Sequence, residues 1–396
     1  MIARGVVLVV VLWVLVLVTA LCLAVHAAAS GRCRLAVRDE HARRAEAGVL
    51  SAVATACGVA AADGLAVDGL RDDWAAGDAA AFTGSINGGP FTIVAASDGA
   101  VRPGLADEAA RLNANTATAE MLAGLNAMDP SAATALVTAR TALAGRIAAV
   151  EGDLTAPTAG LTGPIATPDQ LERLLRRATG GDEAAIDALL DRLTVHSRAL
   201  NLDADGRRRV NLNTAPPADL AGRLGAWLDV EQIDAIVRAR DQQPFASVGE
   251  LLTRPLTVPG PENQPVTVTI PRTAFATFVD QLTVTDAPVL DGRVNVNTAP
   301  AEVLACLPGI DTTTAAALIG HRRTADRDAL RSIGWLLAIL DDEAFRDTAP
   351  HVTTRTAQFR FEVAWTGDHA ARAARVTAVI ERAGGRVALL YLERAE

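Results

Sequence analysis

The sequence contains no lysine, so all 37 of its basic residues are arginine. A chain without lysine has neither the phosphate-binding lysine of a P-loop nor a lysine that forms a Schiff base. Aromatic residues make up only 4% of the 396 residues, although half of the chain is hydrophobic. We therefore expect the cores to be built from alanine, leucine, valine and isoleucine.

The chain is also poor in the residue patterns of metal and catalytic sites. Its four cysteines show no CxxC spacing, and its six histidines form no HxH or HExxH pattern. The residues from Asp203 to Gly206 resemble the start of a calcium loop, but Thr214 occupies the twelfth position, where such loops carry glutamate. The sequence therefore predicts no enzyme and no cofactor, with this loop as a weak calcium candidate.

The formal net charge is −9, whereas DNA-binding domains usually carry a basic patch that neutralises phosphates. The one tight basic cluster, Arg207–Arg209, is more typical of a solvated turn. Charge therefore argues against nucleic acid as a partner. The length of the chain allows two or three domains.

Residues 6–29 form an apolar run of 24 residues without a formal charge. About 20 such residues span a bilayer as a helix, whereas a cleavable secretory signal has an apolar region of roughly 7–15. Arg4 precedes the run, so we expect the amino terminus to stay in the cytoplasm. Residues 34–57 contain no proline and continue the helical pattern, and Asp63-Gly64 is its first expected stop.

One motif occurs three times in the chain: LNANTATAEML (112–122), VNLNTAPPADL (210–220) and VNVNTAPAEVL (294–304). Each copy leads into an apolar helical pattern that ends at an arginine, and a second helical pattern follows at 165–175, 245–252 and 330–340. The arginines are Arg140, Arg240 and Arg322. Three copies indicate a repeated helical hairpin unit.

The side chains of the motif suit a helix start. Asparagine and threonine accept hydrogen bonds from free N–H groups there, and Pro216 and Pro300 are expected in the first turn. In the third unit Pro308-Gly309 is expected to reverse the chain, with Gly309 adopting whatever backbone angles the turn needs. The expected cap residues are Asn113, Asn115, Thr116, Asn211, Asn213, Thr214, Asn295, Asn297 and Thr298.

Hairpin units that bind DNA hold a phosphate with backbone N–H groups at a helix start. Asp311 stands where such a unit has its second glycine, and the corresponding turns at 125–129 and 224–229 also contain an aspartate. These carboxylates oppose a phosphate at all three turns. A membrane-anchored helix-hairpin-helix DNA-binding protein of the competence receptor type, which shares the Asn-x-Asn-Thr-Ala opening, remains the alternative.

Strand patterns flank the repeats. Residues 91–97 precede them, and 359–365, 374–382 and 385–393 follow, with Gly384-Gly385 joining the last two as a hairpin. We therefore predict an α+β fold, in which a long N-terminal transmembrane helix and an antiparallel sheet carry a large inserted all-α block of helix-hairpin repeats.

The amino terminus resembles the leader of type IV pilin-like proteins, because Arg4-Gly5 stands directly before the apolar run. The resemblance implies cleavage by prepilin peptidase between Gly5 and Val6. Most of that superfamily has a glutamate at the fifth mature position, which here is Val10. Together with Asp107-Glu108 after the first strand and the Asn-x-Asn-Thr-Ala units, this resembles minor pseudopilin K of type II secretion (the general secretion pathway protein K family), with helix-hairpin-helix/SAM-like repeats.

The resemblance implies a pilin-like core and a domain order. A leader (1–5) and a transmembrane segment (6–29) would be followed by the pilin-like helix and first strands (30–105). C-terminal strands (353–396) would complete the sheet. The helical repeat regions between them would cover 106–205, 206–290 and 291–352, of which the third is more than the family leads us to expect.

The resemblance also implies a mechanical function, in which a minor pseudopilin caps or initiates the tip of the pseudopilus and aids protein export. Its partners would be the I and J minor pseudopilins through the N-terminal helices, prepilin peptidase, and the secretion machinery of the bacterial inner membrane. The head would be periplasmic. The absence of the glutamate at Val10 would fit a tip subunit, which has no neighbour above it whose amino terminus needs neutralising.

Overall fold

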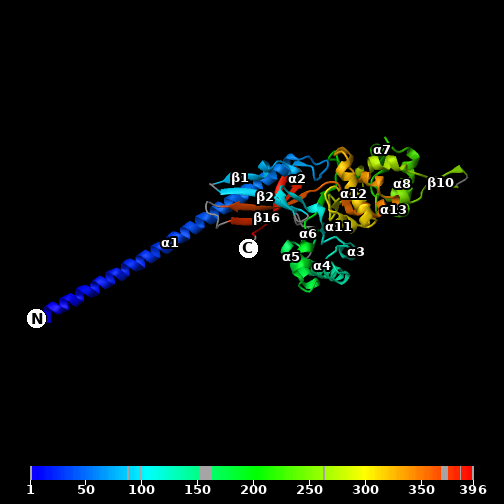
Figure 1. Cartoon of the computed structure of the whole chain (residues 1–396). Coiled ribbons are helices and arrows are strands. Elements are labelled where there is room, and N and C mark those ends of the chain that lie inside the picture. Colours follow the sequence, from blue (N-terminus) through cyan, green and yellow to red (C-terminus); the bar gives the residue numbers. More distant parts are fainter. Residues whose placement is uncertain are drawn as a thin grey trace.

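A single long helix forms a rod that projects from the head of the molecule (Figure 1). The computed structural model describes residues 2–86, 89–97, 100–151, 163–261, 264–366, 373–383 and 385–394. Helix α1 (Ile2–Ala62) has 61 residues and ends directly before Asp63-Gly64, the stop predicted from the sequence. Among the described residues it is the one helix long and apolar enough to cross a membrane.

The two halves of α1 lie in different surroundings. Large apolar side chains between Val7 and Val25 are 51–71% exposed, so this half packs against none of the other residues that the structure describes. Near the other end, Val49, Ala52 and Ala56 are buried against a sheet. One continuous helix therefore supplies both an apolar rod and part of the core of the head.

Seven of the described strands form one sheet, against which α1 packs. Its central strand β15 comes from the end of the chain and pairs antiparallel with β2, so that Glu362 lies opposite Val94. The strands are β1 (Thr83–Ile86), β2 (Gly89–Ser97), β3 (Ala100–Pro103), β4 (Ala106–Asp107), β15 (Gln358–Thr366), β16 (Ala373–Ala383) and β17 (Arg386–Arg394).

Alternation along β15 explains why this strand is central. Phe359, Phe361, Val363 and Trp365 are buried on one face, while the residues between them are partly exposed. The Trp365 ring lies so close to Gly48 of α1 that a Cβ at Gly48 would be 2.3 Å from a ring carbon. The predicted α+β fold, with a long helix on an antiparallel sheet, is confirmed.

The sequence left residues 60–90 without a predicted structure. They form helix α2 (Asp73–Ala76), the 3₁₀ helix η1 (Ala79–Phe82) and strand β1. Trp74 and Phe82 are fully buried in the core between α1 and the sheet. Two of the few aromatic residues therefore fasten a segment that has little periodicity of its own.

The helical block leaves the sheet after β4 and returns to it at β15, and it consists of three units. Each unit begins with a two-residue strand that carries the first asparagine of the motif and closes with a parallel partner strand that ends in threonine. The pairs are β5 (Leu112–Asn113) with β6 (Leu193–Thr194), β8 (Val210–Asn211) with β11 (Leu282–Thr283), and β13 (Val294–Asn295) with β14 (Val352–Thr353). We call them the first (112–194), second (210–283) and third (294–353) units.

Short helices fill the units and share one hydrophobic core that is separate from the core under the sheet. The first unit contains α3 (Ala119–Ala123), α4 (Pro130–Glu151), α5 (Pro168–Ala178) and α6 (Glu183–Arg192). The second contains α7 (Pro217–Leu224), α8 (Val230–Gln242), α9 (Glu250–Thr253), the hairpin of β9 (Leu256–Pro259) and β10 (Pro265–Val268), α10 (Arg272–Phe278) and η4 (Val279–Gln281). The third contains α11 (Ala301–Ala305), α12 (Thr312–Thr324), η5 (Asp328–Leu330), η6 (Ile333–Ala338), α13 (Asp342–Thr348) and η7 (Ala349–His351).

Two helical patterns differ from their prediction. Residues 245–252 form only the start of the four-residue α9, and 330–340 form the 3₁₀ turn η6. In η6 the backbone of Gly334 packs against Ala276 of α10, where a Cβ would be 2.1 Å from the carbonyl oxygen. This close approach between units shapes the segment more than its apolar periodicity does.

Gly309 offers a test of the turn in the third unit. Its φ is +80°, and a Cβ would lie 2.6 Å from the Ala344 carbonyl oxygen, so Gly309→Ala should lower the free energy of unfolding by about 1–3 kcal/mol. Gly320→Ala is the matched control at an exposed position of α12, where an added Cβ would have nothing within 4 Å, and it should stabilise by about 0.5–1 kcal/mol. Urea unfolding measures both, and equal effects would contradict the prediction.

Candidate functional site

The six asparagines of the repeated motif hold each unit together from within. The first asparagine of each pair accepts a hydrogen bond from the backbone N–H of the second, at 2.8 Å for Asn113, 3.0 Å for Asn211 and 3.0 Å for Asn295. The motif in the sequence predicts these acceptors at a helix start. The structure places them in the turn before the helix.

The second asparagine of each pair binds the backbone where the second half of the unit begins. The side-chain amides of Asn115, Asn213 and Asn297 donate to the carbonyl oxygens of Ile165 (3.0 Å), Phe245 (2.9 Å) and Leu330 (3.1 Å). At the start of the first helix, the Thr118 side chain accepts from the Met121 N–H in the first unit, whereas Pro216 and Pro300 occupy the N-cap positions of the next two without a side-chain hydrogen bond. The two prolines thus stand one residue before the first turn.

One arginine of the helix that follows closes the same turn in every unit. Arg140 donates from Nη1 to the carbonyl oxygens of Ala114 and Ala117, at 2.7 and 2.9 Å. Arg240 binds Leu212 and Ala215 in the same way, and Arg322 binds Val296 at 2.7 Å. Arg240 and Arg322 lie near the helix ends that the sequence predicts, whereas α4 continues to Glu151, well beyond the end predicted at Arg140. The similar spacing of the arginines, 27, 29 and 27 residues after the first asparagine of the motif, was the signal of this role.

The three threonines of the motif have different partners. The Thr214 hydroxyl donates to Asp286, and the Thr298 hydroxyl donates to Asp107 at 2.6 Å. Thr116 is exposed and packs against Gly292. Of the three, only Thr298, in the third unit, reaches the seven-stranded sheet.

An aspartate occupies the start of the helix that follows each turn. Asp129, Asp229 and Asp311 accept hydrogen bonds from backbone N–H groups two or three residues ahead, at 2.7–2.8 Å. Hydrogen bonds from Ser131 lower the pKa of Asp129, and those from Thr314 lower the pKa of Asp311. The ionised carboxylates occupy the N–H groups that a DNA phosphate would need, so the DNA-binding alternative is not favoured.

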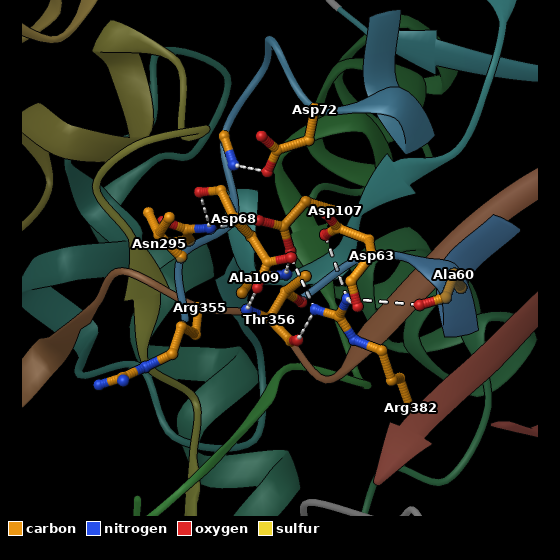
Figure 2. A network of polar contacts seen from close by, with 12 residues as sticks. Ala60, Asp63, Asp68, Asp72, Asp107, Ala109, Asn295, Arg355, Thr356 and Arg382 are labelled. Atoms are coloured by element: carbon orange, nitrogen blue, oxygen red, sulfur yellow. Dashed lines mark hydrogen bonds and ion pairs between the residues drawn. The ribbon is translucent and has the colours of Figure 1, made fainter. Parts of the chain in front are cut away.

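A buried ionic cluster joins the helical block to the sheet (Figure 2). Asp68 is completely buried and accepts from Arg382 Nη2 at 2.6 Å and from the Thr356 N–H at 2.8 Å. Arg382 is 3% exposed and also binds Asp63 at 3.2 Å. These residues come from the loop after α1, from β16 and from the segment that leaves the third unit.

Asp107 in β4 extends the cluster to the motif of the third unit. Its carboxylate accepts from the Asn295 side chain at 2.8 Å, from the Thr298 hydroxyl at 2.6 Å and from the Ala109 N–H at 2.7 Å. The Asp107-Glu108 pair noted in the sequence thus meets two of the predicted cap residues. In the first unit the Asn113 amide binds Ser197 instead.

Burial changes the ionisation of this cluster. It raises the pKa of Asp68 to about 7, against the opposing effects of Arg382 and the Thr356 N–H. Burial also raises the pKa of Asp107, which hydrogen bonds from Thr298, Thr356 and Asn295 partly offset. Burial of the Arg382 guanidinium lowers its pKa, but the Asp68 and Asp63 carboxylates outweigh this effect, so the pKa of Arg382 is raised.

Asp63, Asp68 and Asp72 have carboxylate oxygens within 4.8 Å of one another, a spacing that would suit a cation. Each of them is bound to a guanidinium, however: Arg382 contacts the first two, and Arg327 contacts Asp72 at 2.8 Å. The cluster is therefore held by arginine. In the loop at 203–206, the Asp203 oxygens accept from Asp205, Arg207 and Arg223, and calcium binding there stays a prediction.

The residues assigned to processing lie near the free end of the rod. Gly5 and Val6 belong to α1, and Val10 is 55% exposed in the middle of other exposed apolar side chains. Cleavage at Gly5 stays a prediction.

A protein-family comparison matches residues 210–269 and 294–342 to protein K of the type II secretion system (T2SS). No curated protein matches the chain. Among solved structures it is similar to a chain of the GspK-GspI-GspJ complex from the enterotoxigenic Escherichia coli Type 2 Secretion System, at 14% identity and a TM-score of 0.36, over 91% of this chain and 98% of that one. The family match confirms the resemblance to protein K of type II secretion, and it falls on the second and third units.

Removing the arginine of the buried cluster tests its contribution to stability. Arg382→Gln leaves the Asp68 carboxyl buried without its guanidinium, and the free energy of unfolding should fall by roughly 3–5 kcal/mol. Arg177→Gln, on the exposed side of α5, is the control and should change it by less than about 0.5 kcal/mol. Urea unfolding, followed by tryptophan fluorescence, measures the free energy of unfolding of both variants. If Arg382→Gln lost no more stability than Arg177→Gln, the buried cluster would not contribute to stability as predicted.

The raised pKa of Asp68 makes this loss depend on pH. Its unfolded value is about 3.9 and its folded value about 7, so its contribution to stability is fully present below about pH 4 and disappears as the pH rises through 7. Without Arg382 the pKa of Asp68 in the folded state should rise further, because the carboxylate loses the cation that stabilises its charge. The difference in free energy of unfolding between wild type and Arg382→Gln should therefore be smaller at pH 5 than at pH 8. An equal difference at the two pH values would contradict this prediction.

Proposed function

We propose that this chain is a minor pseudopilin of a type II secretion-like system that caps or initiates the tip of the pseudopilus and so aids protein export. The observation that carries the proposal is α1, one unbroken helix that is an exposed apolar rod at one end and a core element of the head at the other. Such a helix couples the head rigidly to whatever surrounds the rod. The family match over the second and third units supports the same function.

The apolar half of α1 is long enough to anchor the chain in the bacterial inner membrane. With Arg4 on the cytoplasmic side, the chain crosses once and its head lies in the periplasm. At 1.5 Å per residue, the part of α1 beyond residue 29 holds the end of the helix about 50 Å from the apolar run. The bulk of the head therefore stands clear of the membrane surface.

Partners of the I and J minor pseudopilin type would pack along α1. Exposed apolar side chains continue beyond the bilayer-length run, at Leu35 (59%), Val37 (45%) and Leu50 (51%). Apolar surface outside a membrane is usually covered by another protein. Neighbouring helices of the same kind would cover it here, once the chain has been processed by prepilin peptidase and taken up by the secretion machinery.

Two features support a place at the tip. Val10 leaves the rod without the carboxylate that most pilin-like chains use toward the neighbour above. In addition, the helical block lies at the far end of the molecule from the amino terminus (Figure 1), where it would obstruct a further subunit. The proposed function is mechanical and requires neither a cofactor nor a nucleic acid.

The amino terminus of the mature protein tests the proposal. We expect membrane-extracted protein to begin at Val6 when an active prepilin peptidase is present and to retain Met1 when it is absent. Gly5→Val should block cleavage, because the peptidase cuts after this glycine in the family that the leader resembles. Mass spectrometry with amino-terminal sequencing measures both, and a chain that retains Met1 or is cut after Ala29 with active peptidase would contradict the proposal.

A further inference from the structure

We propose that an arginine-lined cleft in the head binds an acidic segment of a partner protein. The cleft has a volume of about 590 Å³ and lies between the loop after α1, strand β3 and the third unit. Its lining contains five arginines and one carboxylate: Arg71, Arg102, Arg322, Arg323, Arg327 and Asp72. We call it the arginine cleft.

The charge of the arginine cleft is opposite to that of the chain, whose net charge is −9. Asp72 neutralises only Arg327, with which it forms an ion pair at 2.8 Å, so the other four arginines leave the arginine cleft positively charged. A concave site lined by charge of one sign concentrates ligands of the other sign. The arginine cleft therefore favours an anionic ligand.

Two of the arginines have no partner within the part of the chain that the structure describes. The side chains of Arg102 and Arg323 form no hydrogen bond or ion pair with a described residue, and the Arg102 Nε is buried with no acceptor there. A buried donor normally has an acceptor in a folded protein. This atom points to an acceptor supplied by another molecule.

The other arginines are held in place by the chain itself. Arg71 donates to the Ala325 carbonyl, Arg322 to Val296, and Arg327 to Asp72 and to the Val67 carbonyl. Fixed side chains lose little conformational entropy when a ligand binds. The planar guanidinium also matches the two oxygens of a carboxylate, which makes this group a better fit than a neutral one.

The rest of the lining selects a polypeptide among anionic ligands. Val67, Leu70, Ile319 and Leu330 give the arginine cleft aliphatic surface, which suits aliphatic side chains between carboxylates. Its described lining contains no aromatic ring on which a nucleic-acid base could stack. Lipid head groups are out of reach, because the loop follows the end of α1, about 50 Å beyond the apolar run.

Binding of defined peptides to the detergent-solubilised full chain tests this proposal. A fluorescein-labelled peptide that alternates glutamate with leucine should bind by fluorescence anisotropy, and its glutamine counterpart should not. Arg102→Gln and Arg323→Gln should each weaken binding about tenfold or more, because each removes a charge-assisted contact. Arg177→Gln, at an exposed arginine outside the cleft, is the matched control. Because Arg323 is exposed, Arg323→Gln should leave the midpoint of urea unfolding unchanged.

Three results would overturn the proposal. They are equal binding of the glutamate and glutamine peptides, equal effects of Arg323→Gln and Arg177→Gln, and tighter binding of a single-stranded oligonucleotide than of the acidic peptide. The last result would instead favour nucleic acid. All three are independent of processing at Gly5, so this proposal and the proposed function can fail separately.

Discussion

The buried contact between Arg382 and Asp68 is the point on which the arrangement of the molecule depends. The guanidinium reaches the loop after α1 and the Thr356 carbonyl from its place on β16. A buried charge without its partner is costly, so this contact forms only when all three segments are in place. It lies between two separate hydrophobic cores, neither of which would by itself fix how the helical block sits on the sheet.

The helical block is a closed insertion between two strands of the seven-stranded sheet. Its exit and entry lie side by side, because β4 pairs with β15 and Phe359 lies opposite Asp107. Each unit inside it is closed in the same manner by a short parallel strand pair. Strain on the block is therefore carried into the sheet and α1 through hydrogen-bonded strands, as the proposed mechanical role requires.

One motif serves two purposes in this block. In every unit its asparagines and the following arginine bind backbone groups and make the turn rigid. In the third unit Asn295 and Thr298 also bind Asp107, and so the repeat becomes the attachment to the sheet. Beside that attachment the same unit lines the arginine cleft, whose charge contrasts with the aspartates that cap the turns.

The sequence by itself determined the parts of the fold that depend on neighbouring residues. These are the continuous helix that stops before Asp63, the three motif copies, and the strands around residues 91–97 and 358–394, because apolar periodicity, helix stops and turn residues are local signals. Even there, the pattern at 330–340 gave way to a contact with Ala276. A close backbone contact from another unit can therefore change the structure that the local sequence pattern predicts.

Only the tertiary structure decided which distant residues meet. The closing strands of the units are two residues long, Arg382 lies 314 positions from Asp68, and the arginine cleft combines loop, strand and helix. A two-residue strand or a single arginine has no periodicity, so the sequence around it does not indicate which distant residue it contacts. Their partners are set by the packing of whole units and by the cost of leaving a buried charge or N–H group unpaired.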